Sequence, residues 1–485
     1  MIPLSLAEIA DIVGGTLSNT DGSPVVTGSV EFDTRELVDG SLFLALPGER
    51  VDGHDFAAAA IAAGAVGVLA AREVDGPAVI VPPVSAAHTR SVALAGDHDG
   101  SGAAVLAALA KLARAVTDRL GVVVVGVTGS SGKTSTKDLI AQLLEHLGPT
   151  VAPPGSFNNE LGHPWTVLRA TEETRHLVLE LSARGPGHIA ALCHTAPPRI
   201  GVVLNVGSAH LGEFGSREAV AKTKGELVEE LSAGGVAVLN SDDPLVAAMA
   251  DRTKVRVVFV GQKSTAHIRA EDLELDEQAR ARFTLVTPQG SAPVALDLHG
   301  AHHVGNALAA VAVALELGAT TEQAAQWLST AQRRSGRRME VTTRPDGVTV
   351  LNDSYNANPE SMSAALKTLA TMARAGNPRR RAWAVLGVMG ELGDDTVAAH
   401  DEIGRLAVRL DISRLVVVGE QARPMHQGAN LEGSWGEESV LVPDVDAAIA
   451  LLREELRGDD VVLVKASKAA ALWRVADALL EADAK

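Results

Sequence analysis

Several residue types are scarce in this sequence, and each scarcity narrows the class of protein. A single cysteine, Cys193, stands among 485 residues, which excludes an intrachain disulfide framework and fits a reducing cytoplasm. Only 3% of the residues are aromatic while alanine and glycine are abundant, which favours closely packed α/β layers over a β-sandwich. The first 15 residues predict an amphipathic helix, with neither a basic leader nor an apolar run that could cross a membrane. We therefore expect a cytoplasmic protein without membrane insertion.

Basic residues are in the minority. The sequence holds 43 Lys and Arg against 60 Asp and Glu, a net charge of −17. This balance argues against a general binder of nucleic acids or membrane surfaces, although it leaves room for a local cationic pocket. The length of the chain predicts two to four domains.

The stretch GVTGSSGKTSTKDL, residues 126–139, carries the clearest chemical signal. Four valines before its TGSSG turn (122–125) predict a buried strand of a parallel sheet, and apolar residues at helical spacing after the turn predict an amphipathic helix. A glycine-rich turn between them directs backbone N–H groups at one point, where they attract a phosphate. Lys133 would reach the β- and γ-phosphates, and the Thr134 hydroxyl would ligate Mg²⁺. The predicted nucleotide-binding residues are Thr128, Gly129, Ser130, Ser131, Gly132, Lys133, Thr134 and Ser135.

This loop departs from the general pattern G-x-x-x-x-G-K-[ST] at one position, because Val127 stands where the first glycine is expected. The prediction is a loop that binds a nucleoside triphosphate but differs from that of a generic GTPase. An ordinary glycine turn followed by a helix is the alternative.

The predicted elements divide the chain into three domains of the α/β class. Residues 1–97 hold strands at 42–46 and 66–70 around an alanine-rich helix, and a polar turn at 97–100 ends this domain. Residues 98–332 alternate helices with strands at 177–181, 200–205, 236–240 and 256–260, which indicates a wound, mainly parallel sheet. A basic linker at 333–338 opens the third domain, 333–485, with strands at 348–352, 382–386, 415–418 and 461–464.

Polar residues follow several of these strands. Glu180 ends an apolar strand, where open α/β sheets place ligand groups, and its carboxylate suits Mg²⁺; a surface carboxylate is the alternative. His210 lies in the loop beyond the strand at 200–205, and a helix carrying Lys222 and Lys224 follows. Residues i and i+2 do not share a helix face, so at most one lysine can point at the site. On spacing alone, solvated helix charges are the favoured interpretation of both.

Two later stretches offer groups for a nucleoside. Asn306, in the first turn of a helix expected to begin after Gly305, is placed to donate to an adenine or a phosphate. In LNDSYNANPESM, residues 351–362, Asp353 is placed for ribose hydroxyls and Tyr355 for packing on a base. The segment 356–359 otherwise reads as a plain turn and helix start.

Together these motifs resemble the Mur ligase family over essentially the whole chain. FDTR (32–35) and GSLFLALPGERVDGHDF (40–56) look like a uridine-nucleotide domain of this family. The segments that look like the dipeptide-adding members are PGSFNNELGHPWTVL (154–168), DSYNANPESM (353–362), LGVMGELGDDTVAAHDEIG (386–404) and VVLVKASK (461–468).

The resemblance implies an N-terminal uridine-nucleotide domain, a central ATPase and a Rossmann-like C-terminal domain. It implies a monomeric ligase that uses ATP to join D-alanyl-D-alanine to UDP-N-acetylmuramoyl-tripeptide through an acyl phosphate, in cytoplasmic peptidoglycan precursor synthesis. Two Mg²⁺ ions and a CO₂-derived carbamate on Lys224 would assist, with Lys222 as the alternative lysine. The resemblance also assigns individual roles. The catalytic residues would be Lys133, Lys224, His210 and Glu180, and the metal ligands Thr134, Glu180, His210 and Lys224. Asn306, Arg338, Asp353 and Tyr355 would bind the nucleotide, and the substrates would contact Thr34, Arg35, Asn158, Asn159, Asn356, Asn358, Lys465 and Ser467.

Three departures from the family pattern bear on these roles. The usual K-G-S-R is Lys465-Ala466-Ser467-Lys468 here, and a lysine cannot make the bidentate fork of an arginine to a carboxylate. The usual E-M-G is Glu180-Leu181-Ser182, and His303 replaces a commoner asparagine.

Three other functions are weighed against this one. A family member that adds the third amino acid, such as diaminopimelate, should carry a D-N-P-R-type motif, which the sequence lacks. A folylpolyglutamate-type ligase would not need the uridine-nucleotide domain. A P-loop protein that uses ATP only as a switch would have no role for the additional Mg²⁺-ligand and lysine positions.

Overall fold

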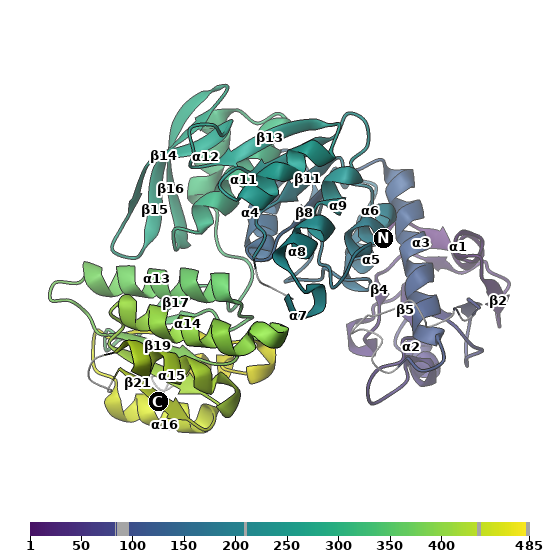
Figure 1. The fold of residues 1–485 in the computed structure, drawn as a ribbon. Coiled ribbons are helices and arrows are strands. Elements are labelled where there is room, and N and C mark those ends of the chain that lie inside the picture. Colours follow the sequence, from purple (N-terminus) through teal and green to yellow (C-terminus); the bar gives the residue numbers. More distant parts are fainter. Residues whose placement is uncertain (83, 85–96, 208–210, 434–437, 482–485) are drawn as a thin grey trace.

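The computed structural model describes residues 1–82, 84, 97–207, 211–433 and 438–481. Three large sheets succeed one another along the chain, each with helices packed on it (Figure 1). Within the described ranges, no helix is both long enough and apolar enough to span a bilayer.

The N-terminal sheet has five strands in the order β2-β7-β6-β5-β4, of which only β2 runs antiparallel to its neighbour. Helix α1 begins at Leu6 because Ser5 caps it: the Ser5 hydroxyl accepts from Glu8 N, and the Glu8 carboxylate accepts from Ser5 N. The helix predicted for the first 15 residues therefore covers only 6–13, after a short strand. The elements are β1 Leu4–Ser5, α1 Leu6–Val13, β2 Thr16–Ser18, β3 Val25–Val26, β4 Val30–Glu31, β5 Ser41–Leu44, α2 Ala57–Ala62, β6 Ala65–Ala70 and β7 Ala78–Ile80.

The central sheet has nine strands in the order β16-β15-β14-β13-β12-β11-β8-β10-β9. Strands β8 to β14 pair in parallel, whereas β14, β15 and β16 form antiparallel hairpins at one edge. The strands are β8 Val123–Thr128, β9 Thr150–Val151, β10 His176–Glu180, β11 Ile200–Val203, β12 Val236–Asn240, β13 Arg256–Gly261, β14 Ile268–Leu275, β15 Arg280–Thr287 and β16 Gly290–His299. The helices are α3 Ser101–Leu120, α4 Lys133–Glu145, α5 Gly162–Val167, α6 His188–Thr195, α7 Leu211–Phe214, α8 Arg217–Lys224, α9 Glu226–Glu229, α10 Pro244–Ala247, α11 His303–Glu316 and α12 Thr321–Thr330.

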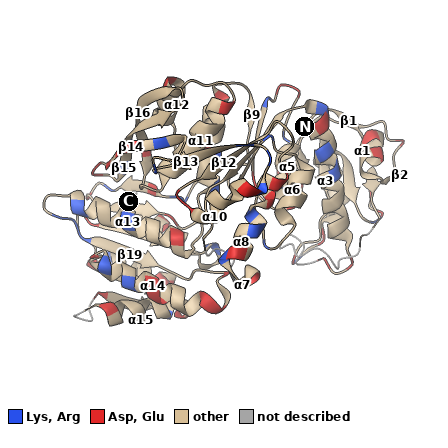
Figure 2. Cartoon of the chain, turned by 45° about the horizontal axis from the view of Figure 1, so that its top comes forward, with Lys and Arg blue, Asp and Glu red and all other residues tan. Residues whose placement is uncertain are grey.

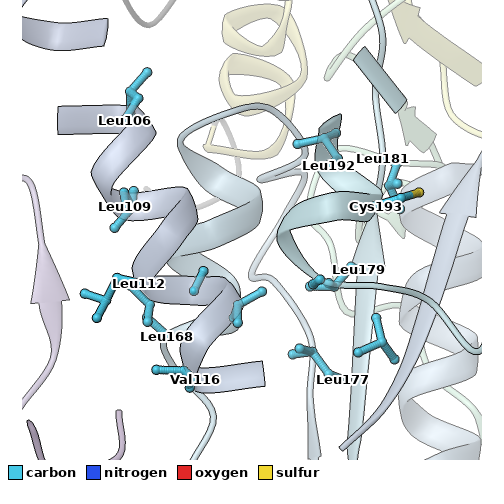
Figure 3. Packing of buried hydrophobic residues seen from close by; sticks show 14 of the residues in the cluster. Leu106, Leu109, Leu112, Val116, Leu168, Leu177, Leu179, Leu181, Leu192 and Cys193 are labelled. Carbon is cyan, nitrogen blue, oxygen red and sulfur yellow. The ribbon is translucent and has the colours of Figure 1, made fainter. Parts of the chain in front are cut away.

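Helices cover both faces of the central sheet. Successive residues of β10 alternate between faces, so Leu177 and Leu179 enter one apolar core while Val178 enters the other. Helices α4, α11 and α12 cover the second face. On the first face, α3 joins the central sheet to the N-terminal one (Figure 3). The side chains labelled there are Leu106, Leu109, Leu112, Val116, Leu168, Leu177, Leu179, Leu181, Leu192 and Cys193.

The C-terminal sheet has six strands in the order β17-β18-β22-β19-β20-β21, and only β17 is antiparallel to its neighbour. Its strands are β17 Glu340–Thr343, β18 Thr349–Asn352, β19 Ala382–Leu386, β20 Arg414–Val418, β21 Ser439–Val442 and β22 Val461–Lys465. Its helices are α13 Pro359–Ala375, α14 Thr396–Arg409, α15 Arg423–Glu432, α16 Val445–Glu455 and α17 Trp473–Glu481. Helix α13 faces the central unit (Figure 1). Acidic and basic residues are interspersed along outer helices such as α8 and α14 (Figure 2).

The α/β class and the three-part plan are confirmed, and each predicted strand coincides with an observed one to within about two residues, except that β8 extends three residues beyond the predicted 122–125. The hairpins β14–β16 and the edge strands β17 and β21 were not predicted. One helix start was wrong, because α11 begins at His303 rather than after Gly305. The boundaries at 97/98 and 332/333 stay predictions.

Candidate active site

The turn between β8 and α4 forms a backbone concavity, residues 129–132, that side chains would fill. A Cβ added to Gly129 would lie 2.9 Å from the Leu204 Cβ. A Cβ added to Gly132, whose φ is +80°, would lie 2.7 Å from the Asn306 Oδ1. The absence of a side chain therefore lets the loop pack closely against Leu204 after β11 and against Asn306 at the start of α11. A glycine-rich backbone between a strand and a helix fits a phosphate.

Asn205, directly beyond β11, fixes the shape of this loop. Its Oδ1 accepts hydrogen bonds from the backbone N–H groups of Ser130 and Ser131, at 3.0 and 2.9 Å, and its Nδ2 donates to Ser131 O at 3.2 Å. From the sequence, this residue was predicted only as the end of a strand, without a role in the site. The only available signal was its place at the carboxyl end of a strand that neighbours β8.

Two side chains with oxygen atoms that could bind a metal, Thr134 and Glu180, meet next to the loop. The Thr134 hydroxyl donates to Glu180 Oε2 at 2.8 Å, and Asn158 Nδ2 donates to Glu180 Oε1 at 2.7 Å. Thr134 and Glu180 are both only 2% exposed. A hydroxyl and a carboxylate at a phosphate loop are the oxygen ligands that Mg²⁺ prefers, so the residues present fit this ion. The structure brings together three predicted residues here.

Two lysines lie close to this pair. Lys133 Nζ donates to Gly129 O at 2.7 Å; burial lowers the pKa of Lys133, and the Glu180 carboxylate opposes that shift. Lys224 is 5% exposed, and burial followed by the charge of Lys133 lowers its pKa well below the ordinary value. Lys222 is exposed. His210, predicted as a metal ligand, lies outside the described residues, and within them no three His, Cys, Asp or Glu side chains cluster to hold a metal.

A pocket flanks α4 on the side of the C-terminal unit. Its walls come from α4, the start of α11 and the linker after α12, and they include Ser135, Leu139, His303, Arg334, Arg338 and Met339. The Arg338 guanidinium lies 4.1 Å from the centre of the Tyr355 ring, and its buried Nε has no hydrogen-bond partner among the described residues. Most of the lining side chains are polar or charged, and Leu139, Leu298, Met339 and Val341 are the apolar ones, a mixed wall that fits the nucleoside part of a nucleotide. His303 lines the pocket, and the neighbouring Asn306 is buried with its Nδ2 3.4 Å from His303 Nδ1.

The loop after β18 contacts the central unit at two points. Asn358 Nδ2 donates to Ser130 O at 3.3 Å, and the Tyr355 hydroxyl is hydrogen-bonded to the Ser156 hydroxyl. The carboxylate of Asp353 accepts from Met339 N at 3.0 Å and from Lys465 Nζ at 2.6 Å. This part of the C-terminal unit therefore touches both the phosphate loop and the loop at 153–159.

The predicted dipeptide residues occupy different environments. Lys465 is 2% exposed, and its ammonium donates to Asp353 and to Asn356 O at 2.8 Å, so it holds the loop together. The Ser467 hydroxyl accepts from Gly390 N at 2.7 Å. The Asn356 side chain is exposed.

The remaining predicted substrate residues lie near α5 or in the N-terminal unit. Asn159 Oδ1 accepts from Gly162 N at the start of α5. Thr34 and Arg35 lie in a 3₁₀ turn, where Arg35 pairs with Asp33 at 2.6 Å. No hydrogen bond or ion pair within the described ranges connects that turn directly to the phosphate loop.

Two of the sequence departures have structural roles. Ser182, in Glu180-Leu181-Ser182, donates from N and from Oγ to Asn158 O, both at 3.0 Å, and so fixes the residue that holds Glu180. Ala466 is fully buried, and its Cβ packs against Gly387.

Comparison with known proteins agrees with this architecture. The family models that match are the Mur ligase middle domain over residues 127–314, the Mur ligase glutamate ligase domain over 337–468 and the Mur ligase family catalytic domain over 28–115. The chain belongs to the Mur ligase family.

The similar relatives cover nearly the whole chain. A UDP-N-acetylmuramoyl-tripeptide–D-alanyl-D-alanine ligase from Mycobacterium tuberculosis is 58% identical over 100% of this chain and 99% of its own. The Escherichia coli ligase of the same name is 34% identical over 99% of each chain. Among solved structures, MurF from Acinetobacter baumannii aligns with a TM-score of 0.84 at 29% identity over 99% of each chain. MurF from Thermotoga maritima in complex with ADP aligns with a TM-score of 0.76 at 28% identity, over 94% of this chain and 98% of its own.

Proposed function

We propose that this chain is an ATP-dependent ligase that forms an amide bond between UDP-N-acetylmuramoyl-tripeptide and D-alanyl-D-alanine, in cytoplasmic peptidoglycan precursor synthesis. The observation that carries the proposal is the set of half-buried Lys133 and buried Thr134, Glu180 and Lys224 at the phosphate loop, in a chain 58% identical to a ligase of that name. We propose that it acts as a monomer.

The first step joins two anions. A terminal carboxylate oxygen of the tripeptide attacks the γ-phosphorus of ATP, and the bond between that phosphorus and the β–γ bridging oxygen breaks. This gives an acyl phosphate and ADP. The glycine-rich loop at 129–132 and the Lys133 ammonium are placed to offset the negative charge and hold the phosphates in line. Asn205 fixes the shape of this loop by accepting from the N–H groups of Ser130 and Ser131, which are therefore occupied in this structure.

Divalent cations fit the same cluster. Thr134 and Glu180, with His210 and a carbamate on Lys224, would hold two Mg²⁺ ions, which when bound supply Lewis-acid charge to the phosphate oxygens. Addition of CO₂ to an amine requires its neutral form, and a buried Lys224 beside Lys133 has a pKa that favours this form. Lys222 is exposed, so burial favours Lys224 over Lys222 for this role.

In the second step the free amine of D-alanyl-D-alanine attacks the acyl carbon. The amide bond forms, the bond from the acyl carbon to the phosphate oxygen breaks, and inorganic phosphate and a proton leave. Water would hydrolyse the same acyl phosphate, so the C-terminal unit must cover the site first. The part of the C-terminal unit that would face the nucleotide carries Arg338, Tyr355 and Asp353. Asn358 of the same unit already donates to the phosphate loop at Ser130 O.

The substrate residues are assigned by position. Thr34 and Arg35 would receive the uridine nucleotide, and Asn158 and Asn159 the peptide end near the metals. Asn356, Asn358 and Ser467 would lie along the dipeptide. We propose that Lys465 shapes this site through Asp353 and Asn356, because its donors already bind these residues.

Phosphate release tests the proposal. The purified chain is given ATP, Mg²⁺ and UDP-N-acetylmuramoyl-tripeptide, with either D-alanyl-D-alanine or single amino acids. We expect release only with the dipeptide, and a product enlarged by that dipeptide. Release when UDP-N-acetylmuramoyl-dipeptide replaces the tripeptide and a single amino acid is the acceptor would favour the ligase that adds the third residue. Release with a folate and glutamate would favour a folylpolyglutamate-type ligase, and release without any acceptor an ATP switch.

A further inference from the structure

The helix that begins at the phosphate loop holds the interdomain linker along one face. Asp138, Gln142 and Glu145 of α4 stand at positions i, i+4 and i+7, so they share that face. Each binds one residue of the segment 332–335, which we call the strap. The bonds are Ser335 Oγ to Asp138 Oδ2 at 2.6 Å, two bonds of 2.9 Å between the Gln142 amide and the Gln332 backbone, and Arg334 to both Glu145 oxygens at 2.6 and 2.5 Å.

The inner end of the strap rests on a buried ion pair. Lys137 and Asp138 are 1% and 7% exposed, and Lys137 Nζ donates both to Asp138 Oδ1 and to Pro153 O, the latter at 2.8 Å. Three segments therefore meet at one pair: the phosphate-loop helix, the strap, and the loop at 153–159 that carries Asn158. A buried ion pair is weak evidence for stability, because apolar side chains of similar volume often serve as well. A role in holding these three segments in position accounts better for the presence of the ion pair.

The chain turns sharply directly after the strap. Arg337 and Met339 have φ values of +57° and +48°, a region that residues other than glycine seldom adopt. Arg338, between them, stacks on Tyr355, and Met339 N donates to Asp353. The strap ends at residue 335, and Arg338 and Met339, which line the pocket from the C-terminal side, follow directly after it. The strap therefore fixes where the chain enters this part of the pocket.

We propose that Lys137, Asp138 and Ser335 are positioning residues for ligation. They set Arg338 and the loop of Asn158 relative to the phosphate loop, through the bonds of Asp138 to Lys137 and to Ser335. Asp138 and Ser335 also lie in the wall of the pocket beside α4. This inference rests on the proposed function. The phosphates of the nucleotide would bind the loop backbone and Lys133, and the cluster makes no hydrogen bond to Lys133. Loss of the cluster should therefore lower turnover more than nucleotide affinity.

The test compares Ser335→Ala with Ser335→Thr in the full chain. Ser335→Ala removes the hydrogen bond to Asp138, and we expect kcat for ligation to fall about tenfold. The dissociation constant of a non-hydrolysable ATP analogue should stay within about twofold, because the phosphate loop is intact. Ser335→Thr keeps the hydroxyl and should recover most of the lost kcat.

A second variant keeps the test valid if Ser335→Ala, a substitution at a buried residue, impairs folding. Gln142→Ala removes a second attachment of the strap, made by a half-buried side chain, and should lower kcat more than it weakens analogue binding. Gln326→Ala, an exposed glutamine on α12, is the matched control and should leave kcat unchanged. A folded Ser335→Ala or Gln142→Ala with wild-type kcat would overturn the inference, as would equal losses in kcat and analogue affinity. A wild-type chain that does not ligate the dipeptide would instead refute the proposed function.

Discussion

His163 on α5 makes the stability of this protein sensitive to acid. Its ring is 1% exposed, neither ring nitrogen has a hydrogen-bond partner among the described residues, and burial lowers its pKa to about 4. In the unfolded chain the ordinary pKa of 6.5 applies. The unfolded state therefore takes up this proton first. The contribution of His163 to stability falls as the pH drops from about 6.5 towards 4, and this contribution changes no further below that.

The size of the effect follows from the shift. At pH 5 the difference of about 1.5 pH units from the unfolded pKa, at about 1.36 kcal/mol per unit, gives a loss of about 2 kcal/mol relative to pH 8. For a unit of 150–250 residues this lowers the unfolding midpoint by about 4–8 °C. His163→Leu keeps the volume and removes the titrating ring, so it should lose that much less stability over the same pH interval.

Thermal unfolding of both proteins at pH 8 and pH 5 measures this difference. Other histidines and carboxylates titrate equally in the two proteins and cancel in the comparison. At pH 8 the variant should be at least as stable as the wild type, because an apolar side chain replaces two unpaired polar nitrogens. Equal acid sensitivity in the two proteins would refute the assignment of a neutral, buried His163.

Three further predictions concern the lysines and one helix crossing. Lys224→Ala should abolish ligation, with partial recovery by added formate, whereas Lys222→Ala should retain activity in the phosphate-release assay; unchanged activity of Lys224→Ala would remove that lysine from the site. Lys133→Ala should abolish formation of the acyl phosphate, measured by trapping it with hydroxylamine, and normal trapping would contradict the role of this loop. Gly404→Ala should destabilise the C-terminal unit by about 3 kcal/mol in thermal unfolding, because its Cβ would lie 1.9 Å from a carbonyl oxygen of α15. Gly305→Ala has open space and should gain up to about 1 kcal/mol, so equal effects of the two alanines would contradict the packing argument.

The meeting of Thr134 and Glu180 could be predicted from the sequence because parallel strands end at one edge. Glu180 pairs with Val127, one residue before the phosphate loop begins, so a carboxylate at the end of its strand had to lie beside Thr134. The long apolar strands and the glycine turn were equally direct signals. These are local features, so they can be recognised in the sequence without knowledge of the fold.

Other features depend on which segments meet in space. Asn205 looks like any polar residue after a strand, and only the pairing of β11 with β8 brings its amide to the loop. The choice between Lys222 and Lys224 depends on helix burial, which spacing alone left open. The hairpins β14–β16 were missed because one face is solvated: their alternating polar residues give a weaker signal than the apolar strands of the buried sheet.

The fate of one oxygen atom tests the central claim most directly. The tripeptide substrate is labelled with ¹⁸O in its terminal carboxylate and turned over with ATP and D-alanyl-D-alanine, and the released phosphate is analysed by mass spectrometry. If the carboxylate is phosphorylated and then captured by the amine, each phosphate carries one ¹⁸O from the peptide. Unlabelled phosphate, or label recovered in AMP, would contradict the account.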